Sequence, residues 1–264
     1  MKKRLLSCAL LLCMSIARAE AARLESHWLT VNGHAIHYVA RGHGRPLLLL
    51  HGGGATPHDS FSKQMRAFAA EHRVIAPEQV GHGRTPDLPG PLSYTRMMED
   101  TAALLAGLAL AQVDVVGFSD GGIIALMLAA HHPELVRRVV VSGANMAPDG
   151  VEDEVLANEQ ARLANPHAVD VGLHHELSFE DKLMRLWTQS PTDHELNPNL
   201  LARITQRVLV MSGDHDVIKM SHTFAIYDAL PDARLWILPN TSHSTFSERP
   251  TWVNNEVLAF LQAP

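Results

Sequence analysis

Eight short apolar runs, most of them separated by longer helix-like segments, constrain the fold of this chain more than any other feature of its sequence. Short apolar runs bounded by turn residues are typical of buried strands, and longer segments with helical periodicity are typical of the helices that connect parallel strands. The pattern predicts an α/β fold with an eight-stranded, mostly parallel sheet and helices on both faces. The expected strands are residues 28–31, 34–39, 46–50, 73–76, 113–116, 138–142, 207–212 and 233–238.

One segment interrupts this alternation. Between residues 147 and 205 no strand-like run occurs. Residues 151–163 and 179–187 look helical, and Asn165-Pro166, Pro191 and Asn197-Pro198 mark breaks in the segment. A stretch of this length is not a simple connection. We therefore expect a core formed by residues 20–146 and 206–264, with a helical cap inserted at 147–205. The expected helices of the core are residues 62–71, 94–110, 122–132, 222–230 and 251–261.

The first 19 residues have the pattern of a secretory signal. Lys2, Lys3 and Arg4 precede a mostly apolar stretch, and Ala17 and Ala19 supply small residues at the two positions that a signal peptidase reads. About a dozen apolar residues are too few for a membrane span, which needs roughly 20. The sequence predicts export to the periplasm or the medium, cleavage after Ala19 and no membrane span in the remaining chain.

Cleavage would also change the charge and the thiol content of the chain. The signal holds four of the 22 Lys and Arg and none of the 28 Asp and Glu, so the remaining net charge is about −10. Such an acidic chain argues against nucleic acid or an anionic membrane as a partner. Both cysteines, Cys8 and Cys13, would be removed, which excludes disulfides, thiolate metal sites and cysteine catalysis. A lipoprotein signal fits less well, because Cys8 is near the start and Leu12 precedes Cys13 where a small residue is preferred.

Seventeen histidines raise the question of a metal site. The densest cluster is His174-His175-Glu176, which lacks the H-E-x-x-H spacing that places two imidazoles and a carboxylate on one helical face. We expect this cluster to be a solvated polar surface, and we predict no metal.

Candidate catalytic residues follow the expected strands at the edge where open parallel sheets bind ligands. Gly117-Phe118-Ser119-Asp120-Gly121 connects a strand to a helix, and its glycines allow the tight turn of a nucleophile elbow. The following helix directs its positive N-terminal dipole at the serine. His51-Gly52-Gly53-Gly54 follows another strand, and its glycines let backbone N–H groups approach a substrate as an oxyanion hole requires. Taken alone, the two motifs could also be an ordinary turn and a flexible loop.

A carboxylate and an imidazole come later in the chain. Asp216 follows the seventh expected strand and His243 follows the eighth. A serine hydroxyl needs an adjacent base, and the base needs a carboxylate that fixes its tautomer and stabilises the imidazolium. Ser119, Asp216 and His243 can fill these roles and occur in that order along the chain. The alternatives are Asp214 as the acid and His51, His82 or His215 as the base.

In these motifs the chain resembles the α/β-hydrolase fold family over almost the whole of its expected exported sequence. The resemblance implies Ser119 as nucleophile, Asp216 as acid and His243 as base. It also implies oxyanion donors at the backbone N–H groups of Gly53 and Asp120, together with a helical cap after the sixth strand. No cofactor is expected. The matching residues are His51-Gly52, Gly81 to Thr85, Gly117 to Gly122, Gly213 to Asp216, and His243 with Glu248 and Pro250.

Three positions depart from the usual pattern of that family. Glu78 stands where relatives often have Asp, and Ser242 stands where Gly usually precedes the histidine, but neither change removes a catalytic group. Asp120 follows the nucleophile where many relatives have an apolar residue. A carboxylate there is stabilised by the helix dipole by roughly 0.3–1 kcal/mol. Alternatively, Asp120 binds a substrate ammonium group or disfavours anionic acids.

The sequence thus predicts an exported serine hydrolase that cleaves a small ester, thioester or lactone through an acyl-enzyme. A carbon–carbon bond hydrolase, an amidase or peptidase, and a cofactor-free perhydrolase are alternatives on the same fold. Epoxide hydrolases and haloalkane dehalogenases are disfavoured because they typically have Asp at the position of Ser119. Outside the enzymes, the alternative is a ligand-binding protein that retains the pocket. Specificity would depend on cap residues, and oligomeric state is not predicted. The cap residues expected over Ser119 are Leu156, Leu173, Leu183 and Trp187, of which Trp187 is the candidate substrate-binding residue.

Overall fold

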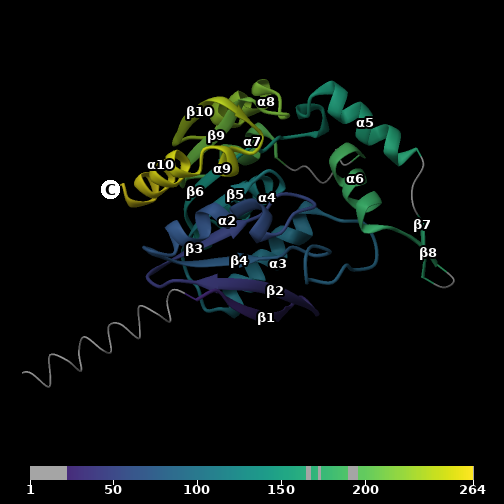
Figure 1. Cartoon of the computed structure of the whole chain (residues 1–264), viewed down its shortest axis with the longest axis horizontal. Helices are drawn as coiled ribbons and strands as arrows, with labels where there is room; N and C mark the ends of the chain where they lie inside the picture. The colour runs from purple at the N-terminus through teal and green to yellow at the C-terminus, as the bar shows by residue number, and fades with distance from the viewer. Residues whose placement is uncertain (1–22, 165–167, 172–173, 190–195, 264) are drawn as a thin grey trace, which may run out of the picture.

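The computed structural model describes residues 23–164, 168–171, 174–189 and 196–263. The expected signal peptide, residues 1–19, lies outside the described residues. An eight-stranded sheet forms the centre of the molecule, with the strand order β1-β2-β4-β3-β5-β6-β9-β10 (Figure 1). All eight expected strands are present. They are β1 (Glu25–Val31), β2 (His34–Arg41), β3 (Arg45–Leu50), β4 (His72–Pro77), β5 (Val113–Phe118), β6 (Val136–Ser142), β9 (Arg207–His215) and β10 (Ala233–Ser242).

The sheet is antiparallel at one edge and parallel elsewhere. β2 pairs antiparallel with β1 and β4, whereas the six strands from β4 to β10 pair in parallel. Asn32 and Gly33 form the turn between β1 and β2, and both have positive φ, at 48° and 86°. Asn-Gly is favoured in such a two-residue hairpin turn because both positions need φ above zero. The predicted mostly parallel sheet is therefore confirmed.

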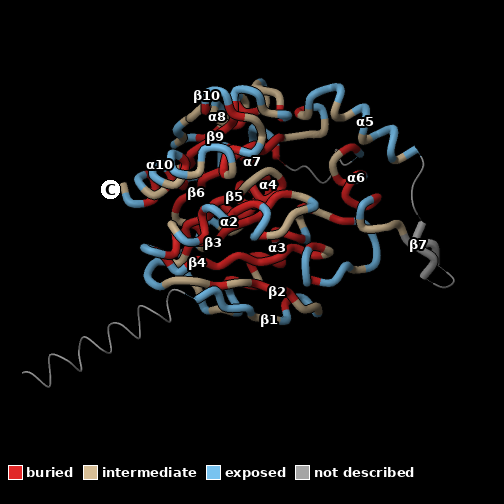
Figure 2. The backbone as a smooth tube through the Cα atoms, in the orientation of Figure 1, coloured by how far each residue is buried: buried red, intermediate tan, exposed pale blue. Residues whose placement is uncertain are grey.

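Helices cover both faces of the sheet because the central strands are apolar on both sides. Leu48 and Leu50 of β3 belong to the hydrophobic cluster beneath α3, α4 and α8, whereas Leu47 and Leu49 belong to the cluster beneath α2, α9 and α10. Buried residues accordingly run through the central strands and α4 (Figure 2). The helices outside the cap are α2 (Pro57–Phe68), α3 (Tyr94–Gly107), α4 (Asp120–His131), α7 (Pro198–Leu201), α8 (Met220–Ala229), α9 (Thr245–Glu248) and α10 (Pro250–Gln262).

The segment after β6 forms a cap beside the sheet (Figure 1). It contains α5 (Asp153–Leu163) and α6 (Phe179–Gln189), as expected, but also two strands that the sequence did not predict. These are β7 (Ala168–Val171) and β8 (His174–Leu177), which pair antiparallel. The expected helical cap is therefore present, but it also includes a short hairpin. Each of these strands has only four residues, too few for a clear alternation of apolar and polar side chains.

The start of the cap is attached to the loop that follows β9. The Glu152 N–H donates to the Val217 carbonyl at 2.8 Å, and the Lys219 N–H donates to the Gly150 carbonyl at 2.7 Å. These two bonds hold the beginning of α5 against the strand end that bears Asp216. In the described part of the chain, no helix is long and apolar enough to cross a membrane.

Candidate active site

Ser119 forms the whole connection between a strand and a helix. β5 ends at Phe118 and α4 begins at Asp120, so the chain reverses direction at this one residue. Ser119 has φ 53° and ψ −121°, a conformation that residues with a side chain rarely adopt. Backbone strain of this kind costs on the order of 1–3 kcal/mol and persists only where the surrounding structure enforces it. The turn is therefore a strained elbow rather than an ordinary turn.

The neighbouring glycines make this strained turn possible. A Cβ atom on Gly117 would overlap the Gly121 carbonyl, and one on Gly121 would overlap the Leu50 carbonyl. The Ser119 N–H also donates to the Ser142 carbonyl at 2.8 Å, which fixes the elbow to β6. Both glycines are thus required by the close approach of backbone atoms.

His243 and Asp216 are joined by a short hydrogen bond at the ends of β10 and β9. The His243 Nδ1 lies 2.6 Å from Asp216 Oδ1, and the Asp216 side chain is completely buried. The carboxylate also accepts hydrogen bonds from the Ser212 hydroxyl at 3.0 Å and from the Ile218 N–H at 2.9 Å. With Nδ1 donating to Asp216, the Nε2 atom of His243 is left to act as a proton acceptor.

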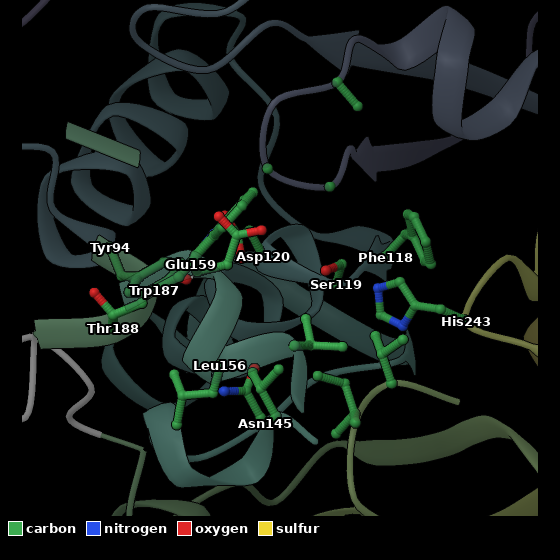
Figure 3. A pocket seen from close by; sticks show the side chains of 17 residues that line it. Tyr94, Phe118, Ser119, Asp120, Asn145, Leu156, Glu159, Trp187, Thr188 and His243 are labelled. Atoms are coloured by element: carbon green, nitrogen blue, oxygen red, sulfur yellow. Dashed lines mark hydrogen bonds between the residues drawn. The ribbon is translucent and has the colours of Figure 1, made fainter. Parts of the chain in front are cut away.

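Ser119 and His243 line one cavity of about 260 Å³. Figure 3 shows the serine side chain and the imidazole on neighbouring walls of this cavity. Among the described residues, no hydrogen bond joins the Ser119 hydroxyl to His243. Catalytic hydrogen bonds often tighten only in the substrate complex, so the arrangement is compatible with proton transfer once a substrate is bound.

The alternative acid lies elsewhere. Asp214 Oδ1 accepts a hydrogen bond from the Thr241 N–H at 3.0 Å, and so binds the loop beneath the histidine rather than its ring. His215, an alternative base, has a side chain that is 74% exposed and lies outside the cavity. The structure thus brings Asp216, and not Asp214, to His243.

His51, a second alternative base, is buried and bonded on both ring nitrogens. Its Nδ1 lies 2.8 Å from the Gly52 carbonyl, and its Nε2 accepts the Gln79 N–H at 3.0 Å. Burial lowers the pKa of His51 to about 3, with a further contribution from nearby His82. The ring is neutral at physiological pH and braces two loops.

His82 braces the same region from the other side. Its Nδ1 lies 3.0 Å from the Val80 carbonyl, and its Nε2 accepts the Gly54 N–H at 3.0 Å. Burial lowers the pKa of His82 as well. The two imidazole rings lie 4.9 Å apart and support the glycine loop together.

At the predicted oxyanion hole, two backbone N–H groups have no hydrogen-bond acceptor among the described residues. In the glycine loop, the Gly52 N–H donates to the Ser60 hydroxyl at 3.2 Å and the Gly54 N–H to His82. The N–H groups of Gly53 and Asp120 have no hydrogen-bond acceptor within the described ranges, and both residues line the Ser119 cavity. Their neighbours fix the loop while these two donors stay available to a ligand.

Asp120 is buried and connects the core to the cap. Its Oδ1 accepts a hydrogen bond from the Tyr94 hydroxyl at 2.9 Å, and its Oδ2 accepts one from Trp187 Nε1 at 2.8 Å. Burial raises the pKa of Asp120, while the bonds from Trp187 and Tyr94 oppose that rise. Trp187 lies on α6, so this single carboxyl group joins the elbow, the first turn of α3 and the cap.

The rest of the cavity wall is mostly apolar, but it includes three polar residues that the sequence motifs did not predict. Tyr94, Asn145 and Glu159 line the cavity, but each lies outside the sequence motifs and reaches the site only through tertiary packing (Figure 3). No lysine or arginine lines it among the described residues. The remaining lining residues are Gly52, Ala55, Phe118, Val151, Val155, Leu156, Thr188, Val217 and Ile218.

The other expected cap and metal residues are placed only in part. Leu183 is buried but does not line the cavity, and Leu173 lies outside the described residues. The side chains of His174-His175-Glu176 also lie outside them. Within the ranges that the structure describes, no group of three or more His, Cys, Asp or Glu could hold a metal ion.

A mostly parallel eight-stranded sheet with a strained serine elbow at the end of its fifth strand is the architecture of an α/β hydrolase. The sequence pattern described as Alpha/beta hydrolase family matches residues 47–256. The chain belongs to this family, as the sequence motifs predicted.

Relatives of known sequence include serine and carbon–carbon bond hydrolases. The chain is 28% identical over 244 residues to the serine hydrolase BPHL from Homo sapiens, covering 86% of this chain and 83% of the relative. It is 29% identical over 238 residues to 2-hydroxymuconate semialdehyde hydrolase from Pseudomonas putida, covering 78% and 83%. These relatives indicate a hydrolase without fixing its substrate.

Solved structures show the same fold. The 2-hydroxy-6-oxo-6-phenylhexa-2,4-dienoate hydrolase from Rhodococcus sp. strain RHA1 superposes with a TM-score of 0.78 at 18% identity, covering 91% of this chain and 99% of that one. Est816, an N-acyl homoserine lactone degrading enzyme, superposes with a TM-score of 0.75 at 22% identity, covering 89% and 100%. At these identities the likeness concerns the fold alone.

Proposed function

We propose that this α/β hydrolase is a serine hydrolase that cleaves a small ester, thioester or lactone through an acyl-enzyme intermediate. The proposal rests on one observation above all, the 2.6 Å bond between His243 and buried Asp216 beside a cavity that the strained Ser119 also lines. An oriented imidazole next to a serine is the arrangement that activates a hydroxyl for attack. No cofactor is needed for this chemistry.

In the proposed reaction, the Ser119 oxygen attacks the substrate carbonyl and its proton passes to Nε2 of His243. Asp216 stabilises the imidazolium, and the N–H groups of Gly53 and Asp120 bind the negatively charged oxygen. The intermediate collapses when the bond to the leaving group breaks and His243 returns the proton to that group. Water then attacks the acyl-enzyme with His243 as base and releases the acid and the free serine.

The charge of the cavity favours this reaction over carbon–carbon bond cleavage. The Pseudomonas putida relative is named for 2-hydroxymuconate semialdehyde, a dienoate that carries a carboxylate at neutral pH. Asp120 and Glu159 line the cavity of the present chain, and no lysine or arginine does so among the described residues. A dienoate would thus meet two carboxyl groups, of which Glu159 pairs at 3.5 Å with Arg162, a residue outside the cavity lining. A neutral ester or lactone carries no charge for these carboxyl groups to repel.

An activity screen with the purified protein tests this proposal. The substrates are neutral esters of increasing acyl length, lactones, amides and a dienoate, with Ser119→Ala as the control. We expect hydrolysis of at least one ester or lactone, with a loss of several orders of magnitude in kcat for Ser119→Ala. Cleavage of the dienoate alone, or activity that survives the substitution, would contradict the proposal. Labelling of Ser119 by a fluorophosphonate separates an enzyme from a ligand-binding protein.

Asp120 has a second candidate role in binding a substrate ammonium group. Its two oxygens already accept hydrogen bonds from Tyr94 and Trp187, but each retains a further lone pair, and the residue lines the cavity. If Asp120 binds the ammonium group, Asp120→Asn should lower kcat/KM for an α-amino ester at least ten-fold more than for its neutral counterpart. Equal losses of kcat/KM for the two esters would mean that Asp120 has only a structural role.

Export is part of the proposed function. Its support is the basic, apolar and small-residue pattern of residues 1–19. Expression of the full chain in a bacterial host, followed by mass measurement of the periplasmic protein, should show cleavage after Ala19. A protein retained in the cytoplasm with residues 1–19 intact would contradict this expectation.

A further inference from the structure

A second serine, histidine and carboxylate lie together at the antiparallel edge of the sheet. Ser26 is on β1, His37 is on the neighbouring β2, and Glu78 directly follows β4. In the β1–β2 pairing Ser26 lies opposite Val39 and Trp28 lies opposite His37. Ser26 and His37 are therefore diagonal neighbours on one face, a spacing that long side chains can bridge.

The three side chains are placed one after another as a polar relay, in which Ser26 and His37 share a hydrogen bond and His37 and Glu78 lie at ion-pair distance. The Ser26 oxygen lies 2.8 Å from His37 Nε2, and His37 Nδ1 lies 3.0 Å from Glu78 Oε2. The direction of the His37 Nδ1–H does not fit a hydrogen bond to Glu78. Among the described residues, this nitrogen has no other hydrogen-bond partner. A proton on the carboxylate side of the ring leaves Nε2 free to accept the serine proton.

The imidazole of this relay is well shielded from water, whereas the serine is accessible. His37 is 1% exposed, and the Trp28 ring packs edge-on against it with the ring centroids 5.1 Å apart. Ser26 lies on an exposed position of β1. An accessible hydroxyl within hydrogen-bond reach of an imidazole meets one requirement of a nucleophilic serine.

A separate cavity of about 420 Å³ opens at this relay. It shares no lining residue with the Ser119 cavity. Arg84 lines it and donates through Nη1 to the Ser26 oxygen at 3.2 Å. A guanidinium group at this oxygen stabilises negative charge on the attacking serine and on an oxygen of the group being attacked. The cavity is thus large enough for a small acyl donor and positively charged at the reacting atom.

We propose that Ser26 is a second nucleophilic serine, activated by His37 and Glu78, which takes up an acyl or phosphonyl group from small activated esters. The Ser26 oxygen bonds to the carbonyl carbon or phosphorus atom while its proton passes to His37 Nε2. The bond to the leaving group then breaks, and the proton leaves with that group.

The test uses the full chain in which Ser119 is replaced by alanine, so that the first nucleophile is absent. A fluorophosphonate is added, and the adducts are located by mass spectrometry of proteolytic peptides. We expect an adduct at Ser26 that is lost when Ser26→Ala is added. Ser62 lines the same cavity and has no hydrogen bond to a histidine in the part of the chain that the structure describes, so Ser62→Ala is the matched control and should leave the labelling rate unchanged.

His37→Gln tests whether the histidine activates the serine. In a chain that retains Ser119, this variant should still be labelled at Ser119, which shows that it is folded, but should be labelled at Ser26 at least ten-fold more slowly. The absence of a Ser26 adduct in the Ser119→Ala chain, or labelling of Ser26 no faster than of Ser62, would overturn the proposal. Because Ser26 and Ser119 lie on different peptides, failure of one proposal is distinguished from failure of the other.

Discussion

Acidification from pH 7 to pH 5 should destabilise this protein through His51. The ring is fully buried, its Nε2 accepts the Gln79 N–H, and burial lowers its pKa to about 3 from an ordinary value of 6.5. In the folded state the imidazole stays neutral at pH 5, because protonation would place a charge in an apolar interior and a donor against the Gln79 N–H. In the unfolded state the same ring takes up a proton below about pH 6.5.

The sign and size of the effect follow from this difference. A lowered pKa in the folded state means that the unfolded state binds more protons between pH 6.5 and 3, so the stability contribution is complete above pH 6.5 and is lost as the pH falls through this interval. Each unit of pKa difference corresponds to about 1.4 kcal/mol. Between pH 7 and pH 5 only part of the interval is crossed, and the loss from His51 alone is about 2 kcal/mol.

Urea unfolding of the wild type and of His51→Gln at both pH values measures this contribution. The glutamine amide oxygen can still accept the Gln79 N–H, but the side chain does not titrate. His82, whose pKa is also lowered by burial, contributes to both proteins and cancels in the comparison. The free energy of unfolding of the wild type should fall by about 2 kcal/mol more than that of the variant. Equal losses would refute the reasoning, because they would mean that His51 is protonated equally in the folded and unfolded states.

Three further predictions concern other parts of the structure. Asp216→Asn should lower kcat for the best ester by about 10⁴-fold, because His243 loses the charge that stabilises its imidazolium; steady-state kinetics with an unchanged kcat would speak against this role. Gly53→Ala should lower kcat by about 10² to 10³-fold, since its Cβ would overlap the Asp120 carboxylate and displace an oxyanion donor, whereas wild-type kinetics would exclude such a shift. Arg137→Met should lower the free energy of unfolding by about 3 kcal/mol in urea titrations, because the buried Asp114 carboxylate loses the cation that lies 2.6 Å from it. Adding Asp114→Asn to this variant should restore much of the lost stability.

The sheet could be predicted from the sequence because its strands bury both faces. Residues 47–50 are four consecutive leucines, and all four are fully buried between two helical layers. The hairpin of β7 and β8 could not be predicted, because its strands are short and include His174 and His175, which have no apolar periodicity. Sequence patterning detects burial, and this hairpin is held by backbone pairing that the pattern does not reveal.

The site residues that directly follow a strand could be predicted from the sequence. The contacts between segments far apart in the sequence could not. The positions of Asp216 and His243 after two strands predicted that the two side chains lie close together, because parallel strands bring their carboxyl ends to one edge of the sheet. The bond from Tyr94 to Asp120 was not anticipated, since it depends on how α3 packs against the elbow. Glu78 was recognised only as a departure from a pattern, because its approach to His37 depends on the pairing of β2 with β4.

The position of Asp120 restricts how this protein can evolve a new preference. The same residue holds the cap through Trp187, receives the Tyr94 hydroxyl, and contributes a backbone N–H beside the nucleophile. A substitution that changed the polarity of the cavity at this point would at once loosen the cap and disturb the residue after Ser119. New selectivity is therefore more accessible through α5, where Glu159 lines the same cavity and, among the described residues, has no hydrogen bond or ion pair with the elbow. The region that can diversify and the region that must be conserved thus meet across one small cavity.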